Sequence, residues 1–300
     1  MEIETLFNQL SNELSGKIHF LEDKPEETLE STLKALWLKA SGTFVSAEKA
    51  IKTTLPELNR EQINKLNELI NQRINNVPLA HLTNRQNFMG IELIADKRAL
   101  IPRKETEILG EKTLELSYEI ALKKDDITIM DVCCGSGNLG IAVAKQNLNC
   151  KVFLSDISSE SVELTRENVE LLDLNDRVIA FESDMFEAFK SDIFYAGFDI
   201  ILCNPPYISS TKVVKMNAEI SLNEPALAFD GGMLGIKIIK QLIAEAPLFL
   251  KPEGWLAFEV GVGQGDFVLT LIEKSKHFQQ IDSVLDAVGN IRVIFAQKVI

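Results

Sequence analysis

The chain has 300 residues, of which 46% are hydrophobic and 25% charged, as is typical of a globular protein that can bury a large core. Its formal net charge of −13 argues against binding that is driven by general attraction to a polyanion. Nucleic acid is therefore disfavoured as a direct partner, although a chain with an acidic total charge can still have a local basic patch. The N-terminus has no basic and apolar leader, and no apolar run reaches the roughly 18 residues of a membrane span. The sequence therefore predicts a cytoplasmic protein with no membrane partner.

The four cysteines and three histidines do not form a metal-binding pattern. No pair of cysteines has C-x-x-C spacing and no histidine cluster accompanies them, which argues against a zinc site. The neighbouring Cys133 and Cys134 are interpreted as two reduced side chains in a buried turn rather than as a disulfide.

Residues 1–80 predict a small all-α domain with nine basic and twelve acidic residues. Asn59 is a plausible N-cap for the last helix of this domain, because Gln62 follows it at the spacing of a capping box. Apolar residues recur at helical spacing over three segments, 3–14, 29–40 and 63–74.

Residues 81–104 have a different pattern, which predicts a hairpin linker between two domains. Two apolar segments, 88–94 and 99–101, flank a polar turn at 96–98. Apolar runs separated by a short polar turn are typical of two antiparallel strands.

Residues 105–300 alternate between apolar strands and amphipathic helices, which predicts an α/β domain with a parallel sheet covered on both faces. The last two strands, 281–285 and 291–297, are too close in sequence for a parallel crossover, so they should form an antiparallel hairpin at the sheet edge. The expected strands are 127–132, 151–156, 178–182, 198–203 and 255–260, and the expected helices include 104–122, 159–172 and 234–246.

A glycine-rich loop, Gly135-Ser136-Gly137-Asn138-Leu139-Gly140, follows the first strand of this domain and satisfies the G-x-G-x-x-G dinucleotide fingerprint. Asp156 ends the next strand, 21 positions after Gly135, where a carboxylate can accept both hydroxyls of a ribose. On these residues an NAD-dependent dehydrogenase is one hypothesis. Asp131 argues against the dehydrogenase hypothesis, because a carboxylate directly before the loop would repel a pyrophosphate but suits the ammonium group of a methionine moiety. The loop therefore predicts a nucleotide-type cofactor that carries an amino acid.

The segment after the third strand, Ser183-Asp184-Met185-Phe186, is a candidate adenine site. The Asp184 carboxylate could accept a hydrogen bond from an adenine amino group, and Met185 and Phe186 could supply an apolar face for the ring. The alternative is that Asp184 caps a short helix.

Asn204-Pro205-Pro206-Tyr207 follows the fourth strand, at the end where open parallel sheets bind their ligands. The two prolines stiffen the segment. An amide or aryl-amine nitrogen is a poor nucleophile because its lone pair is delocalised. The Asn204 side-chain carbonyl and the Pro205 main-chain carbonyl could accept its two N–H groups and stabilise the positive charge that forms, while Tyr207 packs against the planar group. The segment predicts methyl transfer to a planar nitrogen, with these three residues as its catalytic group.

The chain resembles the release-factor glutamine methyltransferases (the HemK/PrmC family), and residues 105–300 resemble a Rossmann-like class I methyltransferase. The resemblance spans most of residues 75–300, whereas the first 75 residues match only in helical character. It rests on these segments: 78–83, 100–103 with 105–107, Asp131-Val132 with Gly135-Ser136-Gly137, Asn204 to Ile208, Glu224-Pro225-Ala226-Leu227, and Glu259-Val260-Gly261 with Gln264-Gly265.

The resemblance implies that the chain uses S-adenosylmethionine, leaves S-adenosylhomocysteine as product, and methylates the glutamine of the Gly-Gly-Gln tip of peptide-chain release factors. It implies that the helical domain docks the release factor and that Asn204 and Pro205 bind the glutamine amide. The cofactor residues that it implies are Asp131, Gly135 and Gly137 for the methionine moiety, Asp156 for ribose, Asp184 and Met185 for adenine, and Asn204 beside the reacting group.

The sequence departs from the family pattern at Cys133, where family members usually carry glycine, and at Met233-Leu234, where an acidic residue usually follows Gly231-Gly232. Two further hypotheses therefore stay open beside the protein-glutamine methyltransferase. One is a methyltransferase of DNA or RNA amino groups, which would need a flipped base. The other is a methyltransferase-fold binding protein of impaired activity.

Overall fold

The computed structural model describes residues 3–213 and 218–300, which form two compact units. The first, called here the helical unit, comprises residues 3–97, 101–104 and 218–224. The second, called here the sheet unit, comprises residues 98–100, 105–213 and 225–300. Every helix of the described residues is too short or too polar to cross a membrane.

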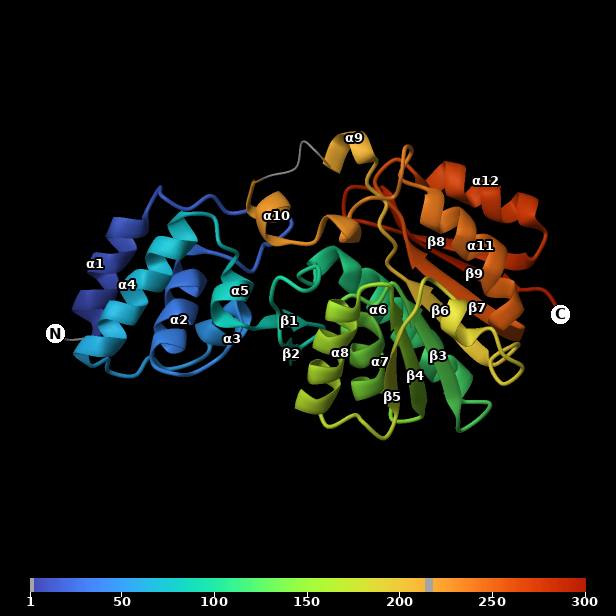
Figure 1. The fold of residues 1–300 in the computed structure, drawn as a ribbon, viewed down its shortest axis with the longest axis horizontal. Coiled ribbons are helices and arrows are strands. Elements are labelled where there is room, and N and C mark those ends of the chain that lie inside the picture. The colour runs from blue at the N-terminus through green and yellow to red at the C-terminus, as the bar shows by residue number, and fades with distance from the viewer. Residues whose placement is uncertain (1–2, 214–217) are drawn as a thin grey trace. The chain divides into compact units, whose positions relative to one another are not determined.

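The helical unit buries an apolar core between helices whose hydrophobic residues share one face. Leu6 and Leu10 of the first helix pack in the same cluster as Leu36 and Trp37 of the second. The three helices predicted at residues 3–14, 29–40 and 63–74 are confirmed. The helices of the unit are α1 (Ile3–Leu14), α2 (Leu29–Ala40), α3 (Ala47–Ile51), α4 (Arg60–Ile74), α5 (Leu79–Thr83) and α10 (Ala218–Asn223) (Figure 1).

Capping contacts explain where the longest of these helices begins. The Asn59 side chain accepts from the Gln62 backbone at 3.0 Å, and the Gln62 side chain accepts from the Asn59 backbone at 2.9 Å. This reciprocal pair satisfies two backbone donors that the first turn of α4 leaves free, as the sequence predicts.

The hairpin of residues 81–104 forms with different strands from those predicted. β1 (Gln86–Phe88) pairs antiparallel with β2 (Ile91–Leu93), and residues 99–101 form no strand. The turn is Met89-Gly90, with φ of +48° and +81°, which is typical of a two-residue hairpin loop. The prediction placed the turn at polar residues 96–98 and was wrong, because Met89 does not resemble a turn residue in sequence.

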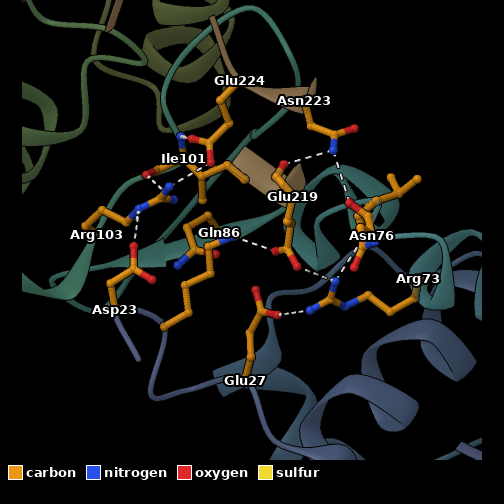
Figure 2. A network of polar contacts seen from close by, with 12 residues as sticks. Asp23, Glu27, Arg73, Asn76, Gln86, Ile101, Arg103, Glu219, Asn223 and Glu224 are labelled. Atoms are coloured by element: carbon orange, nitrogen blue, oxygen red, sulfur yellow. Dashed lines mark hydrogen bonds and ion pairs between the residues drawn. The ribbon is translucent and has the colours of Figure 1, made fainter. Parts of the chain in front are cut away.

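A buried ion-pair network holds α10 to α4 and to the segment between α1 and α2 (Figure 2). Glu219 contacts Lys24 Nζ at 3.0 Å and Arg73 Nη1 at 2.8 Å, and Arg73 Nη2 contacts Glu27 at 3.0 Å. These four side chains are buried and carry two charges of each sign, so their charges balance. Burial opposes ionisation of Glu219, but Lys24 and Arg73 together lower the pKa of its carboxyl.

The sheet unit is built on a seven-stranded sheet of order β5-β4-β3-β6-β7-β9-β8, in which β9 alone runs opposite to the others and pairs antiparallel with both β7 and β8. The predicted parallel strands and the antiparallel hairpin at the sheet edge are confirmed. The strands are β3 (Ile127–Val132), β4 (Cys150–Asp156), β5 (Val178–Glu182), β6 (Phe198–Cys203), β7 (Leu250–Glu259), β8 (Phe278–Leu285) and β9 (Ile291–Lys298).

Alternate residues of the central strands face helices on opposite sides of the sheet. Met130 and Val132 of β3 belong to the apolar cluster that contains Leu242 of α11, whereas the intervening Asp131 contacts Gly140 of α7. The helices and 3-10 turns that complete the unit are α6 (Glu107–Ala121), α7 (Asn138–Gln146), α8 (Ser159–Leu171), α9 (Ser210–Val213), α11 (Lys237–Phe249), α12 (Gly265–Ser275), η2 (Glu187–Phe189) and η3 (Ala226–Ala228), with η1 (Lys104–Thr106) before α6.

Candidate active site

The predicted site residues lie at or just after the carboxyl ends of four neighbouring strands of the sheet unit. Val132, the last residue of β3, is in register with Ser155 of β4 and with Cys203, the last residue of β6. Asp156 of β4 is in register with Glu182 of β5. Because parallel strands end at the same edge of the sheet, the loops after β3, β4, β5 and β6 all begin at this edge.

The glycine loop turns tightly from β3 into α7. Gly135 and Gly137 have φ of +56° and +78°, a region that other residues enter only with strain. Gly140 lies in the first turn of α7, and a Cβ atom there would be 2.4 Å from Leu154 Cδ2 and 2.9 Å from Val152 Cγ1. The third glycine therefore lets α7 pack directly on β4.

Cys133, where the family usually has glycine, also adopts a left-handed conformation, with φ of +59°. The loop keeps this backbone turn at the cost of strain, which is about 1–2 kcal/mol for a residue with a Cβ atom. The Cys133 thiol is free, half-buried and 3.8 Å from Met185 Sδ. Its sulfur thereby joins the glycine loop to the segment after β5.

Asp131 is fully buried, and its two carboxylate oxygens differ in their contacts. Its Oδ2 accepts from the Gly140 backbone at 2.9 Å, whereas Oδ1 has no hydrogen-bond partner among the described residues. Burial, partly offset by the Gly140 hydrogen bond, raises the pKa of the carboxyl to about 8. A buried acceptor without a donor is costly, so a cationic donor such as the ammonium of a methionine moiety fits this position.

Asp156 fastens the glycine loop to the end of β4. Its Oδ2 accepts from the Gly135 backbone and its Oδ1 from the Ser158 backbone, both at 2.9 Å. Burial raises the pKa of this carboxyl, and the two backbone donors favour its charged form. Each carboxylate oxygen has a further lone pair, so Asp156 can still accept from ribose hydroxyls.

The segment after β5 divides into an exposed carboxylate and buried apolar side chains. Asp184 is exposed, whereas Met185 and Phe186 are buried. Phe186 stacks on Phe249 with ring centroids 4.7 Å apart, so it belongs to the core and cannot offer a face to adenine, contrary to the prediction. The Ser183 hydroxyl, and not the Asp184 carboxylate, accepts from the Ala188 backbone of the 3-10 turn η2 at 3.0 Å, so the alternative role of Asp184 as a helix cap is also wrong.

The loop after β6 is held by hydrogen bonds from both of its polar side chains. Asn204 Nδ2 donates to Thr106 Oγ1 at 3.1 Å, and the Tyr207 hydroxyl donates to Glu259 Oε1 at 2.8 Å. Burial, and then the charge of Glu259, raise the pKa of Tyr207 well above its usual value, so the phenol stays neutral. Pro205, between them in sequence, is buried.

Gln264 supports the same loop from its other end. Its Nε2 donates to the Tyr207 carbonyl at 2.9 Å, and its Oε1 accepts from the Gly261 backbone at 2.9 Å. Gly235 approaches so closely that a Cβ atom there would lie 2.1 Å from the Tyr207 carbonyl oxygen. The chain path at Tyr207 is thus fixed by backbone contacts as well as by its hydroxyl.

A buried carboxylate behind the loop was not predicted as a functional residue. Glu259, at the end of β7, accepts from Thr106 Oγ1 at 2.8 Å and lies 3.3 Å from Arg292 Nη2. Arg292 Nη1 in turn contacts Glu105 at 2.8 Å. Burial raises the pKa of Glu259, while Thr106, Tyr207 and Arg292 lower it. The only sequence signal was that Glu105, Thr106 and Glu259 fall in segments shared with the family.

Comparison with known proteins points to a methyltransferase, as the arrangement of the predicted site residues does. A family model described as "Methyltransferase small domain" matches residues 119–236. The release factor glutamine methyltransferase of Clostridium acetobutylicum is 32% identical over 242 residues, 81% of this chain and 82% of its own. That of Fusobacterium nucleatum is 31% identical over 310 aligned residues, 98% of this chain and 84% of its own.

A solved structure titled "delta-N METTL16 MTase domain" is similar in fold, with a TM-score of 0.50 and 13% identity over 69% of this chain and 89% of that one. This likeness shows the Rossmann-like methyltransferase fold alone. The similarity to these curated relatives extends over most of their length. The chain therefore belongs to the family of release factor glutamine methyltransferases.

Proposed function

We propose that this protein transfers the methyl group of S-adenosylmethionine to the side-chain amide nitrogen of the Gly-Gly-Gln glutamine in a peptide-chain release factor. The observation that carries the proposal is the rigidly held loop of Asn204 to Tyr207, which begins at the same edge of the sheet as the glycine loop. The names of the relatives point to the same substrate. Such a reaction belongs in the cytoplasm, where release factors act.

We propose that the residues at the ends of β3, β4 and β5 bind the cofactor. The Asp131 Oδ1 atom would receive its ammonium group, because this oxygen is a buried acceptor without a partner among the described residues. S-adenosylmethionine supplies an electrophilic methyl group on a sulfonium sulfur. The other proposed contacts are Gly135 and Gly137 for the methionine moiety, Asp156 for ribose, Asp184 and Met185 for adenine, and Asn204 beside the methyl group.

The proposed chemistry depends on aligning a weak nucleophile. The Asn204 side-chain carbonyl and the Pro205 main-chain carbonyl accept the two N–H groups of the glutamine amide, which orients the nitrogen and stabilises the positive charge that develops on it. The Tyr207 ring packs against the planar amide. No general base is required in the transition state, because the nitrogen can lose its proton after the methyl group has been transferred.

We also propose that three segments of the chain have different roles. Residues 1–80 would dock the release factor, residues 81–104 would link the two parts, and residues 105–300 would carry out the reaction. The acidic character of residues 1–80 favours a protein partner over nucleic acid.

The test is incubation of the chain with radiolabelled S-adenosylmethionine and a purified bacterial release factor, followed by mass spectrometry of the labelled peptide. We expect one labelled glutamine in wild-type release factor and none when that glutamine is replaced by alanine. Asn204→Ala should lower kcat by about a hundredfold or more, because it removes one of two acceptors for the developing charge. Label in RNA or DNA instead would contradict the proposal, as would cofactor binding without any transfer.

A further inference from the structure

We propose that Thr106 and Glu259 are positioning residues that fix which way the Asn204 side-chain amide faces. They hold its NH₂ group inward, so that the carbonyl oxygen is the atom presented to substrate. This inference rests on the proposed function, in which Asn204 must accept a hydrogen bond rather than donate one.

The direction of the hydrogen bonds follows from counting donors and acceptors. A carboxylate only accepts, so Glu259 must receive the hydrogen of the Thr106 hydroxyl across their 2.8 Å contact. That hydroxyl has a single hydrogen, so towards Asn204 its oxygen can only accept. The Asn204 atom 3.1 Å away must therefore be the NH₂ nitrogen. The reversed amide would bring two acceptor oxygens together.

Several contacts keep Glu259 an acceptor. The Tyr207 hydroxyl donates to its Oε1 at 2.8 Å, and Arg292 Nη2 lies 3.3 Å from the same oxygen. With the Thr106 hydroxyl on Oε2, each oxygen of the carboxylate has a partner. Burial raises the pKa of Glu259, and these donors offset that rise only in part, so the hydrogen-bond geometry rather than the titration carries the assignment.

The same carboxylate therefore holds both side chains that flank the proposed amide site. It holds Tyr207 directly and Asn204 through Thr106. Thr106 stands immediately before α6, yet its side chain makes no capping hydrogen bond to that helix. The hydroxyl thus serves the contact to Asn204 rather than the helix.

The experiment compares Thr106→Val, which keeps the shape but removes the hydroxyl, with Thr106→Ser, which keeps the hydroxyl. Thr106→Val should lower kcat by about ten- to a hundredfold, the range expected for one lost hydrogen bond to a charged network, with the Kd for S-adenosylhomocysteine within about twofold of wild type. Thr106→Ser should retain activity within about threefold. Thermal unfolding of both variants separates this effect from a loss of stability.

Thr113→Val is the matched control, because Thr113, in the neighbouring helix α6, is also a buried threonine but its hydroxyl donates to the Leu109 carbonyl. We expect this control to keep wild-type kcat. The inference is overturned if Thr106→Val keeps wild-type kcat, or if Thr106→Ser is as slow as Thr106→Val.

A second measurement needs no activity. In the NMR spectrum of the ligand-free protein, the Asn204 side-chain NH₂ protons should show nuclear Overhauser effects to the Thr106 methyl group, and their exchange with solvent should speed up in Thr106→Val. Absence of both effects would overturn the inference even if glutamine methylation is found. If both effects are present and no glutamine is labelled, the positioning contacts stand and the proposed function fails.

Discussion

The proposed contact between Asp131 and the cofactor would link cofactor binding to pH through one buried carboxyl. Its pKa is raised from 3.8 to about 8, mainly by burial. Because the raised value favours the protonated form in the folded state, this group stabilises the ligand-free protein fully below about pH 4, and the contribution is lost as the pH rises towards 8. An ammonium at Oδ1 would reverse this preference by pairing with the charged form.

We therefore expect binding of S-adenosylhomocysteine to tighten as the pH rises from about 5.5 to 7, by up to about tenfold per pH unit. Calorimetry at pH 7 in buffers of different ionisation enthalpy should detect proton release on binding. Asp131→Asn, which cannot ionise, should bind more weakly and lose the pH dependence. A slope of the same size in this variant would assign the pH effect to another group.

The backbone conformation at Cys133 is strained in a way that it would not be at a glycine. Its φ of +59° is left-handed, and its thiol contacts Met185 Sδ at 3.8 Å. We expect Cys133→Gly to be more stable than Cys133→Ala by about 1 kcal/mol, because both lose the sulfur contact and only alanine keeps the strain. Chemical denaturation of the two variants measures this difference, and equal stability would mean that the loop relaxes at this position.

At the scale of elements, the contact between α7 and β4 depends on Gly140. A Cβ atom there would lie 2.4 Å from Leu154 Cδ2 and 2.9 Å from Val152 Cγ1, so the helix would have to move off the strand. We expect Gly140→Ala to lower the free energy of unfolding by about 1–3 kcal/mol and to weaken cofactor binding, because the loop before α7 moves with it. Val143→Ala, in the same helix, is the control for a core change that leaves the loop in place. Unchanged Kd in Gly140→Ala would show that α7 and the loop move independently.

The elements that could be predicted from sequence are those whose own residues determine them. β3 and β6 are continuous apolar runs, and α4 has both halves of its capping box in sequence. The five-residue helices α3 and α5 are too short to show a helical period, and they were missed.

The residues of the candidate site could likewise be predicted from sequence only in part. Asp131, Asp156 and Asn204 could be proposed from the sequence because each stands at a strand end beside a recognisable loop. Thr106 and Glu259 were not given a role, because they are 153 positions apart in sequence and only the fold brings them into contact. Single-sequence patterns report local geometry, so a positioning contact of this kind has no sequence signature of its own.

At the scale of the whole molecule, the chain returns to the helical unit once more after residue 104. Residues 105–213 belong to the sheet unit, residues 218–224 to the helical unit, and the chain returns to the sheet unit at Pro225. The excursion therefore follows the Asn204–Tyr207 loop and precedes α11. Glu224 continues the attachment begun by Glu219, since it accepts from the Ile101 backbone at 2.8 Å and from Arg103 Nη2 at 2.6 Å.

The buried pairs of Glu219 should make this attachment strong. Glu219→Ala would leave Lys24 and Arg73 buried with one acidic partner fewer, and removing one member of a buried ion pair typically costs about 3–5 kcal/mol. We expect hydrogen exchange to speed up in α4 and in residues 23–27, which contact the same network, while strands β3 and β6 of the sheet unit keep wild-type protection. Glu68→Ala is the control, because Glu68 pairs with Lys65 on the exposed face of α4 and such a pair contributes less than about 1 kcal/mol. Equal exchange in the two variants would mean that the apolar core alone holds the helical unit together. Faster exchange confined to Glu219→Ala would mean that a residue downstream of the Asn204–Tyr207 loop stabilises the unit proposed to dock the substrate.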